Sequence, residues 1–217
     1  MRSRGNPMLR WIGWGYLALA LSMSILLFLP VQAIVTATSS LSMRGIGFAY
    51  LLLLVLGGLF LVGLLAVASM ILRAVGWFGL CRRRSKIACI AFADVAVIQP
   101  AALVSLTVGL ATLNSNSSVS IAALWLSVLA ELTAIARLYT STRYFAPMLL
   151  VVVGYGGIGI AAIASSVSKS ILTGMLGHLA ASSIAVLVLG VAATILILHP
   201  EPSMIEPGRG EVVASGQ

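Results

Sequence analysis

The chain has 217 residues, of which 60% are hydrophobic and only 8% are charged, and its formal net charge is +8. A soluble domain carries about 25% charged residues, so this chain cannot cover itself with a water-compatible surface, and the solvent for most of it must be lipid. The basic residues lie in short segments beside apolar runs, which excludes nucleic acid as a partner and indicates an excess of positive charge on one side of a membrane.

Apolar runs of roughly 20 residues predict transmembrane spans. Because a backbone in lipid must satisfy its own hydrogen bonds, each span is expected to be a helix. The first run follows a basic N-terminus, residues 1–10, as it would in a signal peptide. It is long enough to span by itself, and Trp11 and Trp14 can anchor its start, so we favour a retained span. The six expected spans are 11–35, 46–72, 87–113, 119–139, 144–168 and 170–198.

The predicted fold is therefore an all-α polytopic transmembrane bundle, with a membrane domain over residues 11–198. Trp77 and Phe78 fall in an expected loop that runs from Arg73 to Lys86 between the second and third spans. The tail after the last span, residues 199–217, carries three prolines, three acids and three glycines. Such a segment cannot bury enough apolar surface to fold, so it is predicted to be a disordered cytoplasmic tail.

The basic segment Arg82-Arg83-Arg84-Ser85-Lys86 decides the expected orientation. The segments on its side of the membrane hold eleven basic residues, and those on the other side hold only Arg44 and Lys169. Because basic loops stay in the cytoplasm, both termini are predicted to be cytoplasmic and the protein to lie in the cell membrane. The eleven residues are Arg2, Arg4, Arg10, Arg73, Arg82, Arg83, Arg84, Lys86, Arg137, Arg143 and Arg209.

Two cysteines, Cys81 and Cys89, flank this basic segment. Thiols on the cytoplasmic side of a membrane stay reduced. The chain has no CxxC motif and no Cys/His cluster, so no metal site is expected. We interpret the two cysteines as small apolar fillers.

Asp94 and Glu131 are the only acids within the apolar spans. Asp94 lies seven residues from the start of its span and Glu131 eight residues from the end of the next, antiparallel one, which places both about 10–12 Å deep. Pro100 frees the carbonyl of Ala96, and the Gln99 amide lies close by. Buried charges in a membrane are costly, so Asp94, Gln99 and Glu131 form a candidate proton or cation site. The alternative is that each acid is neutral or pairs with an arginine at the inner surface.

Small residues at every fourth position let helices approach closely in lipid. Three spans carry such a pattern in the half of the membrane away from the basic segment, so spans three, five and six are predicted to pack tightly there. The expected helix-packing residues are Ala101, Ser105, Gly109, Gly157, Ala161, Ser165, Gly177, Ala181 and Ala185.

Two further patterns are interpreted as packing features. Val153-Gly154-Tyr155-Gly156 resembles part of a potassium-channel filter. The expected preceding threonine is replaced by Val152, and the segment follows a cytoplasmic loop, so we interpret it as a glycine-rich helix face. His178 is a lone histidine within a span, and we expect a hydrogen-bonded helix contact rather than a cofactor ligand.

In general style the chain resembles the small, uncharacterised multi-pass membrane proteins of archaea, with Leu/Ile/Gly-rich spans and short basic loops. The resemblance implies no activity. Motifs of metalloproteases, serine hydrolases, P-loop and Rossmann enzymes are absent, so the sequence leans against an enzyme and predicts no cofactor. The favoured function is a non-catalytic accessory or structural subunit of a membrane complex, with other subunits or a second copy as partner. The alternative is a small proton- or cation-coupled transporter or channel that uses Asp94 and Glu131.

Overall fold

The computed structural model describes residues 6–39, 46–83, 85–111, 117–167 and 171–200, and every regular element in these ranges is a helix. Six of the helical segments are long and apolar enough to cross a membrane, which confirms the predicted all-α class and the six candidate spans. α3, η2 and α4 together form one of these segments. The elements are α1 (Pro7–Ser39), α2 (Ile46–Cys81), α3 (Lys86–Ala93), the π-helix η2 (Asp94–Ile98), α4 (Gln99–Ala111), α5 (Ser117–Leu138), α6 (Phe145–Ser166) and α7 (Ile171–Leu198).

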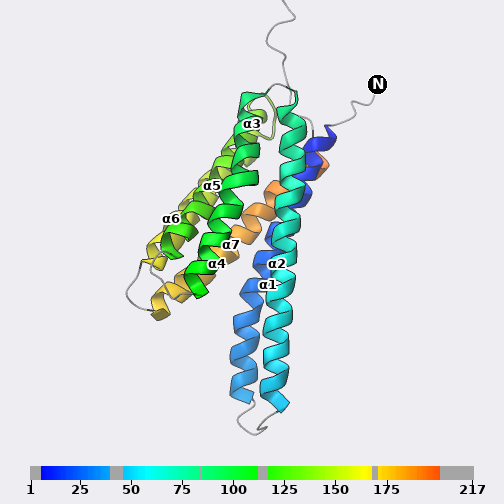
Figure 1. Cartoon of the computed structure of the whole chain (residues 1–217). Coiled ribbons are helices and arrows are strands. Elements are labelled where there is room, and N and C mark those ends of the chain that lie inside the picture. Colours follow the sequence, from blue (N-terminus) through cyan, green and yellow to red (C-terminus); the bar gives the residue numbers. More distant parts are fainter. Residues whose placement is uncertain (1–5, 40–45, 84, 112–116, 168–170, 201–217) are drawn as a thin grey trace, which may run out of the picture.

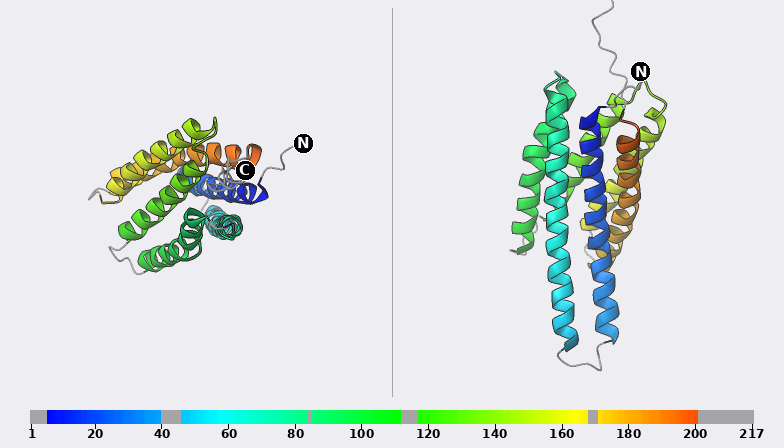
Figure 2. Two further views of the ribbon diagram at one scale, coloured as in Figure 1. Left: turned by 90° about the horizontal axis from the view of Figure 1, so that it is seen from above. Right: turned by 90° about the vertical axis from the view of Figure 1, so that its right-hand side faces the viewer.

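The helices form a bundle in which both ends of the described chain lie on the same side (Figures 1 and 2). The Asn6 N–H donates to the Pro200 carbonyl at 2.8 Å, and the Tyr139 hydroxyl donates to the His199 carbonyl at 2.7 Å. Burial raises the pKa of Tyr139, so its hydroxyl stays a neutral donor. The turns after α2 and α5 lie at this same end, whereas the α1–α2 hairpin extends past the other helices at the opposite end (Figure 1).

The packing order places α1 between α2 and α7, while α6 lies between α7 and α5. Glycines allow α1 to approach α2 closely. A Cβ atom at Gly76 would lie 2.7 Å from the Met8 carbonyl oxygen and 3.1 Å from the Ile12 nitrogen, both of them backbone atoms of α1. A Cβ atom at Gly15 would lie 3.0 Å from the Ser69 carbonyl oxygen of α2. Glycine is therefore required on both sides of this contact.

We expect Gly76→Ala to lower the free energy of unfolding by about 1–3 kcal/mol, because the added methyl group forces the two backbones apart. Gly63→Ala on the same helix is the matched control, because a Cβ atom there meets nothing within 4 Å. That variant should be neutral or slightly stabilising, since alanine favours a helix over glycine. Detergent-denaturation curves of the two purified variants compare them directly, and equal losses would show that close approach is not the cause.

The small-residue ladders lie in different surroundings. Ala181 and Ala185 are buried, and a Cβ atom at Gly177 would lie 2.5 Å from the Ser165 Cβ, so α7 meets α6 there. Gly157 and Ala161 are exposed, and a Cβ atom at Gly157 would meet nothing within 4 Å.

In the third span, Ala101 and Ser105 are exposed. The hydroxyls of Ser105 and Ser120 lie 3.0 Å apart in a hydrogen bond, and α4 packs on α5. The surroundings of Gly109 lie outside the described residues.

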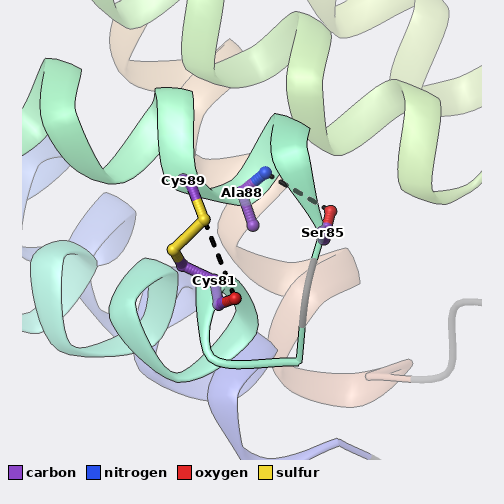
Figure 3. Close-up of a disulfide and its surroundings, with 4 residues drawn as sticks. All are labelled: Cys81, Ser85, Ala88 and Cys89. Carbon is purple, nitrogen blue, oxygen red and sulfur yellow. Dashed lines mark hydrogen bonds between the residues drawn. A yellow bond between two sulfur atoms is a disulfide. The ribbon is translucent and has the colours of Figure 1, made fainter.

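The turn between α2 and α3 is shorter than the sequence suggests, because α2 continues past Arg73 to Cys81. Cys81 and Cys89 form a disulfide across this turn (Figure 3). The expectation of two reduced thiols is therefore wrong. The reason is geometric: the tight turn brings the two Cα atoms to 4.6 Å, which is within the range of a disulfide. A long basic loop, as expected from the sequence, would have kept them apart.

Some sequence-based expectations fall on other parts of the chain. The prediction of disorder for the tail falls, after residue 200, outside the described residues. So do several members of the charge count, namely Arg2, Arg4, Arg44, Arg84, Lys169 and Arg209.

Candidate functional site

A buried ion pair joins α2 to α5 near the end of the bundle that carries the α2–α3 turn. Arg73 of α2 pairs through Nη1 with Oε2 of Glu131 on α5, and both side chains are buried. The Trp77 Nε1–H donates to Glu131 Oε1 at 2.7 Å, and the Gln99 amide Nε2 donates to Oε2 at 2.9 Å. Three donors from two other segments therefore hold the Glu131 carboxylate.

The remaining groups of Arg73 are also matched. Its Nη2 donates to Gln99 Oε1 at 2.8 Å, and its Nε donates to Ser69 Oγ at 3.2 Å. The guanidinium carbon lies 5.4 Å from the centre of the Tyr16 ring on α1, a favourable cation–π distance. Since Gln99 accepts from Arg73 and donates to Glu131, its amide orientation is fixed by the pair.

The helix periods explain how these side chains converge. Ser69, Arg73 and Trp77 are four residues apart and so line one face of α2, and Ser127 and Glu131 do the same on α5. In the third span the Gln99 N–H donates to the Asp94 carbonyl five residues earlier, which makes η2 a π-turn. This wide turn immediately precedes Pro100, which lacks an N–H. A π-turn widens the helix and brings side chains five positions apart toward one face.

Asp94 is the second carboxyl of the site, and its surroundings differ from those of Glu131. Its Oδ2 accepts from the Ser127 hydroxyl at 2.6 Å. Asp94 is 7% exposed, whereas Glu131 is fully sealed at 0%. Arg73 already balances Glu131, so within the described residues Asp94 lacks a basic partner in direct contact. The site thus holds one arginine and two carboxyls, and of the two carboxyls Asp94 alone keeps some access to its surroundings.

Tyr16 adds an unmatched donor to the same region. It is fully buried, and its hydroxyl is the one buried side-chain polar atom in the described part of the chain that has no hydrogen-bond partner. Tyr16 lies close enough to Glu131, Arg73 and Tyr155 to interact with them electrostatically. Buried polar atoms are rarely left unpaired, which sets this hydroxyl apart from the matched groups of the network.

The structure brings Gln99 and Glu131 into direct contact and joins Asp94 to the same helix through Ser127. Sequence reasoning missed the other contributors, which are Arg73, Trp77, Ser69, Ser127 and Tyr16. Arg73 had been assigned to a loop. The regular four-residue spacing from Ser69 through Trp77 was the signal that could have placed it on a continuous helix face.

The other sequence candidates have no hydrogen bond to this network among the described residues. His178 of α7 is half-buried. Val153 is exposed and Tyr155 is buried within the unbroken helix α6, where the Tyr155 ring packs 4.6 Å from Trp125. In the described ranges, three or more His, Cys, Asp or Glu side chains nowhere gather in a way that could hold a metal ion.

Comparison with known proteins identifies no relative of this chain. No protein-family model, no curated protein and no solved structure matches the chain. The function must therefore be argued from the site itself.

Proposed function

We propose that the protein is a small transport protein of the cell membrane that couples the movement of its substrate to a proton or a monovalent cation. The observation that carries this proposal is the charge imbalance of the buried site. Two carboxyls, Asp94 and Glu131, lie near a single arginine in a low-dielectric setting. Ionisable residues within membrane spans usually face a functional cavity or a partner, because an unpaired charge there is costly.

In this proposal Asp94 and Glu131 have different roles. Glu131 is sealed and fixed by three donors, so it serves as the permanent counter-charge of Arg73. Asp94 retains slight exposure, and its Oδ2 accepts from the Ser127 hydroxyl. When ionised, Asp94 leaves the site with a net negative charge. A proton or a monovalent cation at Asp94 restores neutrality, and its arrival and departure would be the coupled step.

The test is flux in liposomes that contain the purified full chain and a trapped pH-sensitive dye. After a pH step or an opposing sodium gradient, the natural sequence should equilibrate faster than protein-free liposomes. Asp94→Asn keeps the side-chain shape but removes the titratable group, so we expect its flux to fall to the protein-free level. Thr133→Val is the matched control, because Thr133 is exposed on α5 and bonds only within its own helix, to the Leu129 carbonyl.

The flux experiment can contradict the proposal in two ways. Flux by the natural sequence that equals the protein-free leak would rule out proton and sodium transport. Undiminished flux by Asp94→Asn, with the control also active, would remove Asp94 as the coupling group.

The second candidate is a non-catalytic accessory subunit, and the exposed face of α2 favours it. Only 6% of the residues in the most apolar stretch of α2 are buried within the chain, compared with 50% in α5. A photo-crosslinking residue at Leu64, on this face, should give one discrete heavier product if a partner subunit packs there. A residue at Leu150, which is exposed on α6, is the control. Lipid adducts alone would contradict a partner on α2.

We infer that both termini are cytoplasmic. The exposed basic side chains of the described residues support this orientation, since Arg10, Arg82, Arg83, Lys86, Arg137 and Arg143 all belong to the end with the α2–α3 turn. Arg73 no longer counts among the basic residues that indicate orientation, because it is buried in the ion pair. A reporter that is active only outside the cytoplasm, fused after residue 217, should be inactive, and activity would reverse the orientation.

A further inference from the structure

The α2–α3 turn presents a concentrated positive surface. Arg82, Arg83 and Lys86 are exposed within five residues of one another in the chain. Among the described residues, both acids are buried in the network below, so these charges have no acidic partner at the surface. Arg84 lies outside the described residues and is not part of the argument.

The described residues on both sides of position 84 are held in place. The disulfide ties Cys81 to Cys89, and the Ser85 hydroxyl caps α3 by accepting from the Ala88 N–H at 3.4 Å (Figure 3). Arg82 lies over the Phe78 ring, with its guanidinium carbon 5.1 Å from the ring centre, and Phe78 packs against Phe92. Arg82 and Lys86 therefore lie at the end of α2 and the start of α3, which the disulfide joins.

The start of α3 adds fixed partial charges to this surface. Lys86 and Ile87 are the first residues of the helix, and first-turn N–H groups have no acceptor within the helix. They form the positive end of the helix dipole, which favours anions. The exposed side chains of Arg83 and Lys86 lie on either side of this helix start in the chain, so full charges and backbone donors are offered together.

Apolar side chains lie directly below the charges. Ile90 is 71% exposed and lies one turn of α3 after Lys86. Val97 continues the exposed apolar surface deeper along the same span, and the exposed Phe78 flanks it on α2. A soluble anion would gain nothing from these groups, whereas a lipid places its phosphate at the interface and its acyl chains beside them.

We propose that the α2–α3 turn binds the phosphate headgroup of an anionic lipid, with Arg82, Arg83 and Lys86 contacting the phosphate and the outer face of α3 contacting an acyl chain. The chemistry that recognises the lipid is the basic cluster at the membrane interface. This inference does not depend on the transport proposal, because the turn would bind lipid whatever the buried site does.

The test is native mass spectrometry of the full chain released from nanodiscs that contain equal amounts of phosphatidylglycerol and phosphatidylcholine. We expect the natural sequence to retain phosphatidylglycerol preferentially. Each basic residue near an anionic surface contributes roughly fivefold in affinity. The variant Arg82→Gln/Arg83→Gln/Lys86→Gln should therefore lose at least about fivefold of this enrichment.

The matched control is Arg137→Gln/Arg143→Gln, which removes two exposed charges at the same end but away from the turn. Its enrichment should be unchanged, and an equal loss would overturn the proposal by showing a non-specific charge effect. Absence of enrichment in the natural sequence would also overturn it. If inorganic phosphate displaces the bound lipid, the turn is a soluble-anion site and the lipid assignment is wrong. If the triple variant fails to fold, Lys86→Gln should show the loss and Lys86→Arg should restore it.

Discussion

Replacing Arg73 by methionine is expected to lower the free energy of unfolding by about 3–5 kcal/mol, because it leaves Glu131 as an unpaired buried charge. Arg73 contacts Glu131, Gln99 and Ser69 at once, so the substitution also strands two neighbouring polar groups. Methionine keeps much of the side-chain volume and thereby limits the effect of a cavity. Titration of the purified protein from mild detergent into sodium dodecyl sulfate, followed by Trp fluorescence, measures the loss.

The double variant Arg73→Met/Glu131→Leu separates the charge effect from packing. When both members of a buried pair are replaced by apolar groups of similar size, the cost is small or the protein gains stability. We therefore expect the double variant to recover most of what Arg73→Met loses. Arg137→Met is the control, because Arg137 is exposed at the end of α5 and should change stability little. A double variant as unstable as the single one would show that the ion pair does not determine the loss.

The six candidate spans could be predicted from the sequence because the lipid bilayer imposes a simple rule on the segments that cross it. Roughly 20 consecutive apolar residues are long enough to cross a bilayer, and only a helix satisfies their backbones. Helix ends are set by weaker effects. The sequence predicts that Arg73 to Cys81 belongs to a basic loop after the second span. In the structure the charge is balanced by Glu131, so α2 continues.

The site could be predicted in part for a similar reason. Antiparallel neighbours carry residues of equal depth to the same level, and this rule places Asp94 and Glu131 together. The arginine and the tyrosine of the network come from α2 and α1, and their proximity depends on packing that no local pattern encodes. The small-residue ladders show the same limit. Gly157 belongs to a ladder but meets no neighbour within 4 Å, whereas Gly76 lies between Leu72 and Leu80, outside any ladder, and faces the backbone of α1.

The Cys81–Cys89 disulfide is also expected to contribute strongly to the free energy of unfolding. Replacing Cys81 by serine should lower the free energy of unfolding by about 2.5 kcal/mol, the chain-entropy contribution of so short a closed loop. The loop is short because the two cysteines are separated by only 8 positions. Cys89→Ser should cause the same loss, and the double serine variant should lose no more than either single one, because all three remove one bond.

Reductant provides the control, because it should destabilise the natural sequence to the level of the serine variants and leave those variants unchanged. A further loss in the double variant on adding reductant would show that the effect does not come from this bond.

Alkylation in native membranes then tests whether the Cys81–Cys89 bond is present in the cell. Disulfides persist mainly in oxidising compartments, although intracellular proteins of hyperthermophilic archaea are an exception. The basic residues beside the bond instead predict a cytoplasmic position. We expect Cys81 and Cys89 to resist a thiol reagent until reductant is added. Labelling without reductant would place reduced thiols at the turn, and α2 would then be held to α3 by packing such as the Phe78–Phe92 contact.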